Sequence, residues 1–439
     1  MKYSRWVLIL SVAIVVLGVL IPLTTHYVDF DKIITANSYF PLDEQINRNW
    51  PRFRGPNGQG IVADTNVPQN WDGKTGLGIL WETEVPLPGM SSPVVWQKRV
   101  FLSGADPNKQ NVFCFDAVSG RLLWTGDVSV PPLKAGQKPL RLDDAMSAGY
   151  AAPTVTTDGQ RVYAIFPTGV VGCFDFDGNK VWKKDLGRPD NAYGYACSLV
   201  MFQNLLLIQF DQGTTEEDQK SMMIAIDGAT GNFAWQKKRP VRSSWATPII
   251  INAADKNQLI ACSTPWVIAY NPADGTELWR AKCLSGDIAA SPIYADGIVV
   301  AIDMYNGFIA IRPDGSGDVS STHIAWSARE ITPERSSPIS KDGLIFILLG
   351  DSNVVCFRSS DGKELWEQRM KSDFWASPSL AGDRLYLLSV TGEVYIIEAG
   401  TEYKELAKCE LYEECYATPA FVDGHIYIRG AKHLYCIGE

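Results

Sequence analysis

Short apolar runs, separated by turn residues, recur along most of this chain. Runs such as 161–166 (RVYAIF) and 384–388 (RLYLL) combine β-branched and aromatic residues with period-two alternation, which is typical of strands. From residue 79 onwards these runs fall into units of about 40 to 50 residues, and each unit holds four short strands. The pattern predicts an all-β protein built by repetition of one small sheet.

Two positions mark the repeat, a small residue next to a proline at its start and a tryptophan near its end. The starts are Ser92-Pro93, Ala152-Pro153, Cys197-Ser198, Thr247-Pro248, Ser291-Pro292, Ser337-Pro338, Ser377-Pro378 and Thr418-Pro419. The matching tryptophans are Trp124, Trp182, Trp235, Trp279, Trp326 and Trp366. The eighth unit stops before its fourth strand, and residues 79–85 (ILWETEV) supply a strand of the missing type at the other end of the chain.

These features predict an eight-bladed β-propeller over residues 79–438. A four-stranded sheet with two apolar faces buries both when sheets stack radially, and a closed ring hides most strand edges. We expect the strand at 79–85 to close the ring, with Trp81 in the outermost strand of the eighth blade. Two stacked sandwiches are the alternative, but they do not explain one motif that continues from end to end.

The N-terminal segment predicts membrane attachment. Lys2 and Arg5 lie in a short tail, residues 1–5, and an uncharged run follows from Trp6 to Leu23. About 18 residues suffice to cross a bilayer core, so residues 6–24 are expected to form a transmembrane signal-anchor. The positive tail places the rest of the chain in the periplasm or outside the cell, with the anchor in the inner (cytoplasmic) membrane. A cleaved signal peptide is the alternative.

Residues 25–78 are interpreted as a linker that ends in a leader rich in turn residues. The leader, Trp50–Gly60 (WPRFRGPNGQG), holds three Gly and two Pro, which exclude a helix or a regular strand. Trp50, Arg52, Phe53 and Arg54 are its candidate contact residues. We expect Phe53 to pack on the propeller and at least one of the two arginines to pair with acidic residues of the ring; a tether without fixed structure is the alternative.

The net charge and the numbers of histidines and cysteines limit the kinds of partner and site that the chain is expected to have. The chain has a net charge of −9 and no long basic run, so a nucleic-acid partner is not expected. It has four histidines, none of them at metal-ligand spacing, and no metal site is predicted.

Of its nine cysteines, Cys114, Cys173, Cys356 and Cys436 share a third-strand position that holds Ala in other units, which indicates buried core thiols. A pairing of Cys409 with Cys415 stays open.

The repeat resembles that of a known family. The segments 116–124 (DAVSGRLLW), 227–235 (DGATGNFAW), 271–279 (NPADGTELW) and 358–366 (RSSDGKELW) are similar to the pyrroloquinoline-quinone (PQQ) repeat. This resemblance implies a propeller in which each tryptophan docks between adjacent blades. The family includes PQQ-dependent dehydrogenases as well as non-catalytic propellers, such as the lipoprotein of the outer-membrane β-barrel assembly machinery, and fold alone does not choose between them.

Several marks of the dehydrogenases are missing from the sequence. It contains no Cys-Cys pair and no Cys-x-x-Cys-His haem motif. We therefore expect no catalytic residues and no cofactor, and we interpret the chain as a non-catalytic scaffold that binds a protein or peptide partner at the cell envelope. A quinoprotein dehydrogenase with PQQ and Ca²⁺, and a binding protein for a glycan or small ligand, are the alternatives.

The predicted binding site is one mouth of the central channel, because the loop entering each first strand lies there. The position three residues before the start proline, or before Ser198, is occupied by Met90, Tyr150, Tyr195, Trp245, Ala289, Arg335, Trp375 and Tyr416. An acidic fringe is expected nearby from Asp287, Glu334, Asp373 and Glu414. Aromatic faces suit peptides, sugars and quinones alike. The alternative is that these aromatics act as wedges between blades.

Overall fold

The computed structural model describes residues 40–62, 64–133, 135–136, 138–142, 148–328, 335–350 and 352–439, all within the compact unit Tyr39–Glu439. The predicted cytoplasmic tail (1–5) and signal-anchor (6–24) lie outside these residues, as does Glu334. In the part of the chain that is described, no helix is both long and apolar enough to cross a membrane.

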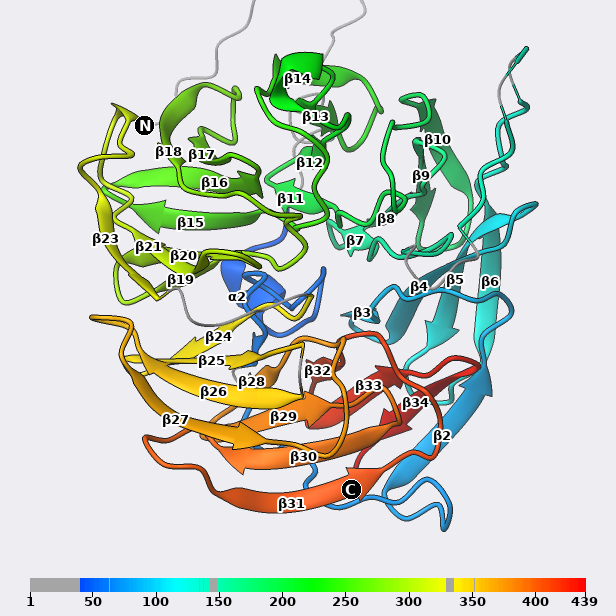
Figure 1. The fold of residues 1–439 in the computed structure, drawn as a ribbon. Helices are drawn as coiled ribbons and strands as arrows, with labels where there is room; N and C mark the ends of the chain where they lie inside the picture. Colours follow the sequence, from blue (N-terminus) through cyan, green and yellow to red (C-terminus); the bar gives the residue numbers. More distant parts are fainter. Residues whose placement is uncertain are drawn as a thin grey trace, which may run out of the picture. The chain divides into compact units, whose positions relative to one another are not determined.

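Eight small antiparallel sheets are arranged around a central axis, which confirms the predicted eight-bladed propeller (Figure 1). From blade 1 to blade 8 the innermost strands are β3 (Val94–Trp96), β7 (Thr156–Thr157), β11 (Val200–Phe202), β15 (Ile249–Ala253), β19 (Ile293–Ala295), β24 (Ile339–Lys341), β28 (Ser379–Ala381) and β32 (Ala420–Val422). The second strands are β4 (Arg99–Ala105), β8 (Arg161–Ile165), β12 (Leu205–Phe210), β16 (Lys256–Ser263), β20 (Ile298–Asp303), β25 (Leu344–Leu348), β29 (Arg384–Leu388) and β33 (His425–Arg429). The third strands are β5 (Gln110–Asp116), β9 (Val170–Asp175), β13 (Met222–Asp227), β17 (Trp266–Tyr270), β21 (Gly307–Ile311), β26 (Asn353–Arg358), β30 (Glu393–Glu398) and β34 (His433–Ile437).

The outer strands differ from the inner three in their burial. They are β6 (Leu122–Asp127), β10 (Lys180–Asp185), β14 (Phe233–Lys238), β18 (Glu277–Lys282), β23 (Ile324–Ala328), β27 (Glu364–Arg369), β31 (Glu405–Glu410) and β2 (Ile79–Glu84). Most residues of the second and third strands are buried, because neighbouring blades cover both faces of each sheet. Along β2 half-buried and exposed residues alternate, as expected for an edge strand with one face on the next blade.

Ring closure follows the sequence prediction. The sheet of blade 8 has the order β2-β34-β33-β32, and Trp81 lies opposite Cys436 in an antiparallel pair. The N-terminal strand therefore occupies the outermost place in the last blade. The indole Nε1 of Trp81 also donates a hydrogen bond to the Ala117 carbonyl of blade 1 at 3.1 Å, so this strand joins the two ends of the ring.

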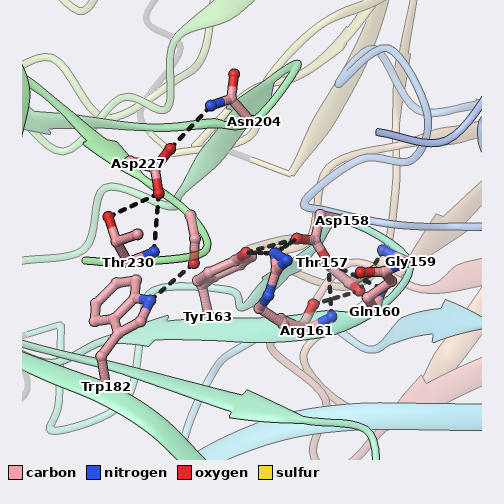
Figure 2. Close-up of polar contacts among 11 residues, drawn as sticks. Thr157, Asp158, Gly159, Gln160, Arg161, Tyr163, Trp182, Asn204, Asp227 and Thr230 are labelled. Carbon is pink, nitrogen blue, oxygen red and sulfur yellow. Dashed lines mark hydrogen bonds and ion pairs between the residues drawn. The ribbon is translucent and has the colours of Figure 1, made fainter. Parts of the chain in front are cut away.

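The tryptophans dock between blades as the resemblance implied, and the boundary between blades 2 and 3 shows how (Figure 2). Trp182 Nε1 donates to the Gly228 carbonyl at 2.8 Å, and a Cβ on Gly231 would lie 2.8 Å from the indole. Asp227 Oδ1 accepts from the backbone N–H and the hydroxyl of Thr230, each at 2.8 Å, and so shapes the turn. The repeat therefore needs Asp to build the turn and Gly to let the tryptophan approach it.

Four features of the fold depart from the sequence reading or add to it. The segment read as linker (25–78) contains a short helix, α2 (Asp43–Asn47), and a strand, β1 (Ile61–Val62), that pairs in parallel with β28 of blade 7. A second parallel strand, β22 (Gly317–Asp318), covers the outer edge of blade 4, and a 3-10 turn, η1 (Glu216–Asp218), lies in a loop of blade 3.

All nine cysteines are free thiols, so the open pairing of Cys409 with Cys415 is not formed. Eight of them are buried, including the four at the shared third-strand position, as predicted. Burial raises the pKa of Cys114 and of Cys436 to about 12, which keeps these thiols protonated at neutral pH.

Candidate functional site

A cavity of about 630 Å³ lies at the centre of the ring. Each blade lines it with the residue that stands two positions before a Ser or Thr, and this Ser or Thr itself stands two positions before the first strand. We call these eight residues the rim: Met90, Ala152, Ala196, Trp245, Ala289, Arg335, Trp375 and Tyr416.

The eight hydroxyl residues form a continuous ring below the rim, which we call the belt: Ser92, Thr154, Ser198, Thr247, Ser291, Ser337, Ser377 and Thr418. The backbone N–H of each of the first seven donates to the hydroxyl oxygen of the next blade, over distances of 2.9 to 3.1 Å. The belt therefore sets the mutual register of the blades around the axis.

This register corrects two of the predicted site residues. In blade 2 the proline precedes the belt hydroxyl instead of following it, and blade 3 has no proline. Counting three residues back from the proline of blade 2, or from Ser198 in blade 3, therefore gives a residue that lies before the rim position. Tyr195 is fully buried in blade 3, where its hydroxyl donates to the Gln209 carbonyl at 2.9 Å. Tyr150 packs beneath the insertion of blade 1 and contacts the backbone of Leu140 and Leu142. Ala152 and Ala196 take their places at the cavity.

The remaining aromatic positions gather at the cavity in two clusters of tilted rings. The Arg335 guanidinium lies 4.1 Å from the centre of the Trp375 ring, and Trp375 lies 5.0 Å from Tyr416. On another side of the cavity Trp245 lies 5.1 Å from Tyr193 and donates from Nε1 to the Gly194 carbonyl at 2.8 Å. The three rings of Trp245, Trp375 and Tyr416 are half-buried and line one space, so they do not serve only as wedges between sheets.

The expected acidic fringe is only partly present at this cavity. Asp287 lines it, but its carboxylate is paired with Arg242 at 3.0 Å. Glu414 accepts from the Tyr416 hydroxyl at 3.0 Å, and Asp373 accepts from the Ser352 hydroxyl at 2.5 Å. Both are exposed residues outside the lining. Two of these carboxylates thus hold neighbouring side chains, and one is neutralised by an arginine.

The leader closes the other end of the cavity. Trp50 pairs with Val95 of blade 1, Pro51 accepts from Thr157 of blade 2, Gln59 accepts from Tyr294 of blade 5 at 2.9 Å, and β1 joins blade 7. Figure 1 shows this N-terminal part, in blue, inside the ring. Phe53 lines the cavity, so the leader packs on the propeller as predicted for this residue.

The prediction for the leader arginines was wrong. Arg52 and Arg54 are both buried, and neither forms an ion pair with any residue that the structure describes. Arg54 Nη2 instead donates to the carbonyls of Pro338 and Gln59, the latter at 3.0 Å. At Arg54, carbonyl oxygens of the leader and of the segment before the first strand of blade 6 thus take the place of the expected carboxylates.

Other lining residues were missed by the sequence reading. Tyr193, Met304 and Tyr305 come from loops that carry no repeat signal, and only folding brings them to the cavity. The belt does have a sequence signal, since six of its eight members directly precede the start proline. From the sequence alone this signal indicates only a small residue at the start of a strand.

Glu413 holds the loop that carries Tyr416. Its carboxylate accepts from the Tyr435 hydroxyl at 2.6 Å and from the backbone N–H of His433 at 3.0 Å, and it lies 2.7 Å from His433 Nδ1. Burial alone would raise the pKa of Glu413, but the hydrogen bonds from Tyr435, His433 and Lys432 together outweigh burial and lower this pKa.

A lowered pKa in the folded state means that the unfolded chain binds protons more readily. The stabilisation by Glu413 is therefore complete at neutral pH and is lost as the pH falls below about 4.5. We expect Glu413→Gln to lower the free energy of unfolding by about 1 kcal/mol at pH 7, and we expect this difference to shrink at acid pH. Urea unfolding between pH 3.5 and 7 measures it, with Glu402→Gln on the exposed β30–β31 turn as control. A difference that does not change with pH would contradict the assignment.

The residues of the cavity do not fit PQQ held by Ca²⁺. A Ca²⁺ site needs several oxygen ligands, usually including carboxylates. Asp287 is the one described carboxylate in the lining, and it is already paired with Arg242. No cluster of three or more His, Cys, Asp or Glu side chains able to hold a metal occurs among the described residues. We derive no reaction step through this cofactor.

Fold and site together define an eight-bladed propeller of PQQ-like repeats with a blind axial cavity. A family model described as outer membrane protein assembly factor BamB matches residues 57–198, 109–368 and 316–405. These matches extend over most of the sequence, and the chain belongs to this family.

Individual relatives are distant. BamB of Yersinia pestis is 21% identical over 290 residues, which is 62% of this chain and 70% of that protein. The crystal structure of BamB from Moraxella catarrhalis superposes with a TM-score of 0.58 at 13% identity, covering 82% of this chain and 97% of that one. A europium-containing methanol dehydrogenase superposes with a TM-score of 0.70 at 11% identity, covering 93% and 100%. At such identities the structural likenesses show the fold alone.

Proposed function

We propose that this chain is a non-catalytic scaffold of the cell envelope that binds a protein or peptide partner at the rim of its axial cavity. The observation that carries the proposal is the cavity itself, which presents half-buried aromatic rings around a blind space of about 630 Å³. Large aromatic faces give contact area at low entropic cost, as is typical of recognition surfaces. The family name supports a role in assembly at the outer membrane.

The walls of this cavity suit recognition because they are rigid. Seven hydrogen bonds of the belt link the blades at the axis, and indole-to-carbonyl bonds such as that of Trp182 link them near the periphery. A preorganised surface loses little conformational entropy when a partner binds. Among the described residues that line the cavity, no belt hydroxyl is hydrogen-bonded to a histidine or a carboxylate that could act as its base, which favours binding over catalysis.

A photo-crosslinking amino acid placed in the full-length chain within cells tests the partner. We expect residues 375 and 416 at the rim to give a discrete crosslinked protein, and residue 181 on the outer strand β10 to give none. Crosslinks from residue 181 but not from the rim would move the interface elsewhere. Turnover of the purified chain with PQQ, Ca²⁺ and an artificial electron acceptor would overturn the non-catalytic assignment, and selective retention on immobilised glycans would favour the glycan alternative.

We further propose that residues 6–24 anchor the chain in the inner membrane, with the propeller in the periplasm or outside the cell. The uncharged run behind a positive tail supports this arrangement. The full-length chain should resist alkaline extraction from membranes, and its mature N-terminus should be that of the translated sequence. A mature N-terminus beyond residue 24 would instead show a cleaved signal peptide.

A further inference from the structure

The belt is a ring of hydrogen-bond donors that face the cavity. All eight hydroxyl residues line the cavity and are more than nine-tenths buried. A hydroxyl oxygen that accepts a backbone N–H still has its own proton to donate. Among the described residues, the Thr247 hydroxyl donates to the sulfur of Cys197, and none of the other seven hydroxyls donates to a protein acceptor. The cavity therefore offers a ring of hydroxyl groups that can donate to a ligand.

Buried positive charge lies next to this ring. Arg54 donates to the carbonyl of Pro338, the neighbour of belt residue Ser337. Arg429 Nη1 donates to the hydroxyl of Ser91, the neighbour of Ser92, at 2.6 Å. Neither arginine has a carboxylate partner among the described residues.

These arginines keep their charge at neutral pH. Burial lowers the pKa of Arg54 and of Arg429 to about 9, which still leaves them protonated under physiological conditions. In the part of the chain that the structure describes, Arg54 Nε, Arg54 Nη1 and Arg429 Nε have no acceptor. Although the whole chain is acidic, two cations without a carboxylate partner therefore lie behind the cavity wall, close to the belt.

The geometry also decides which part of a ligand reaches the belt. In each blade the chain runs from the rim residue through the belt residue into the first strand, whose residues contact the leader, as Val95, Thr157 and Ile339 do. The belt therefore lies between the aromatic rim and the leader. Because the leader closes the cavity behind the belt, an extended chain cannot pass through it. A chain end fits this depth better than an internal segment, which would have to turn back within the cavity.

We propose that the belt captures the C-terminal carboxylate of a peptide whose last side chains contact Trp245, Trp375 and Tyr416 at the rim. Donor hydroxyls and unpaired guanidinium groups select a negatively charged end over an ammonium end. The inference rests on the proposed function, since it names the part of a protein partner that enters the cavity.

The test compares two forms of one peptide on the full-length chain in mild detergent. Acetyl-Ala-Ala-Ala-Phe is titrated by calorimetry as the free acid and as the C-terminal amide, which differ only in the terminal group. We expect the acid to bind at least about tenfold more tightly, because charged acceptors form stronger hydrogen bonds than neutral ones. Equal affinities would overturn the proposal, and so would acetate alone binding as tightly as the peptide, which would indicate an adventitious ion only.

Variants of one belt residue locate the effect. Ser291→Ala removes one donor and should weaken binding of the acid several-fold while leaving the amide unchanged. Ser291→Thr keeps the hydroxyl, as Thr154 and Thr418 do in other blades, and should bind like the original chain. If Ser291→Ala binds neither the acid nor the amide, this variant is misfolded. The comparison of acid with amide on the unaltered chain then decides the proposal. Rim crosslinks to a protein together with equal acid and amide affinities would retain the proposed function and reject this inference.

Discussion

Replacing Trp50 by alanine is expected to lower the free energy of unfolding by about 3 to 5 kcal/mol, the usual loss for a large aromatic residue in a core. The Trp50 side chain is 1% exposed and packs 5.7 Å from Phe421 of blade 8, while its backbone pairs with Val95 of blade 1. Its indole nitrogen has no hydrogen-bond partner among the described residues, so the expected loss comes from packing. Trp50 thus fixes the leader to both ends of the ring.

Two measurements separate this role from a general loss of stability. Leu42→Ala, at a position that is 71% exposed in the same N-terminal segment, should change the unfolding free energy by less than about 0.5 kcal/mol. Trypsin should leave the native chain intact at the buried Arg52 and Arg54, but should cleave there in Trp50→Ala. Free cleavage at these arginines in the unaltered chain would contradict the packed leader.

Trp279→Ala is expected to cost about 3 to 5 kcal/mol of unfolding free energy, more than the same change at the other docking tryptophans. Trp279 is fully buried, because strand β22 from the next blade covers the edge of β18. Its Nε1 donates to Gln258 Oε1 at 2.7 Å instead of to a carbonyl of the next blade. Removing it would leave both a cavity and an unsatisfied amide oxygen.

The two contributions can be measured apart by chemical denaturation. Trp279→Phe retains most of the ring but not the N–H, and should cost about 1 to 3 kcal/mol because Gln258 is buried. Trp235→Ala is the matched control, since Trp235 is half-buried and bonds to the Pro272 carbonyl at 3.2 Å. Equal losses for Trp279→Ala and Trp235→Ala would show that β22 adds nothing to the burial of Trp279.

The sequence by itself determined the architecture of this protein. Repetition of one apolar pattern predicted eight four-stranded blades, and the missing last strand predicted closure by residues 79–85, which pair with β34. The Ala-for-Cys exchange at one strand position predicted buried thiols. These inferences succeed because strand formation, turn formation and burial depend on short-range sequence patterns, and these patterns recur in every repeat.

Tertiary structure decided the remaining part of what surrounds the axis, since six of the eight positions predicted from the sequence do line the cavity. The proline used as a marker is not what aligns the blades, so Tyr150 and Tyr195 were placed at a cavity that Ala152 and Ala196 line. The leader was recognised as turns, yet its place across the ring and the carbonyl partners of Arg54 depend on blades nearly 300 residues away. Trp279 carries the same motif as its counterparts but is buried by a strand from another blade. Such contacts join residues with no fixed spacing along the chain, and only the closed ring brings them together.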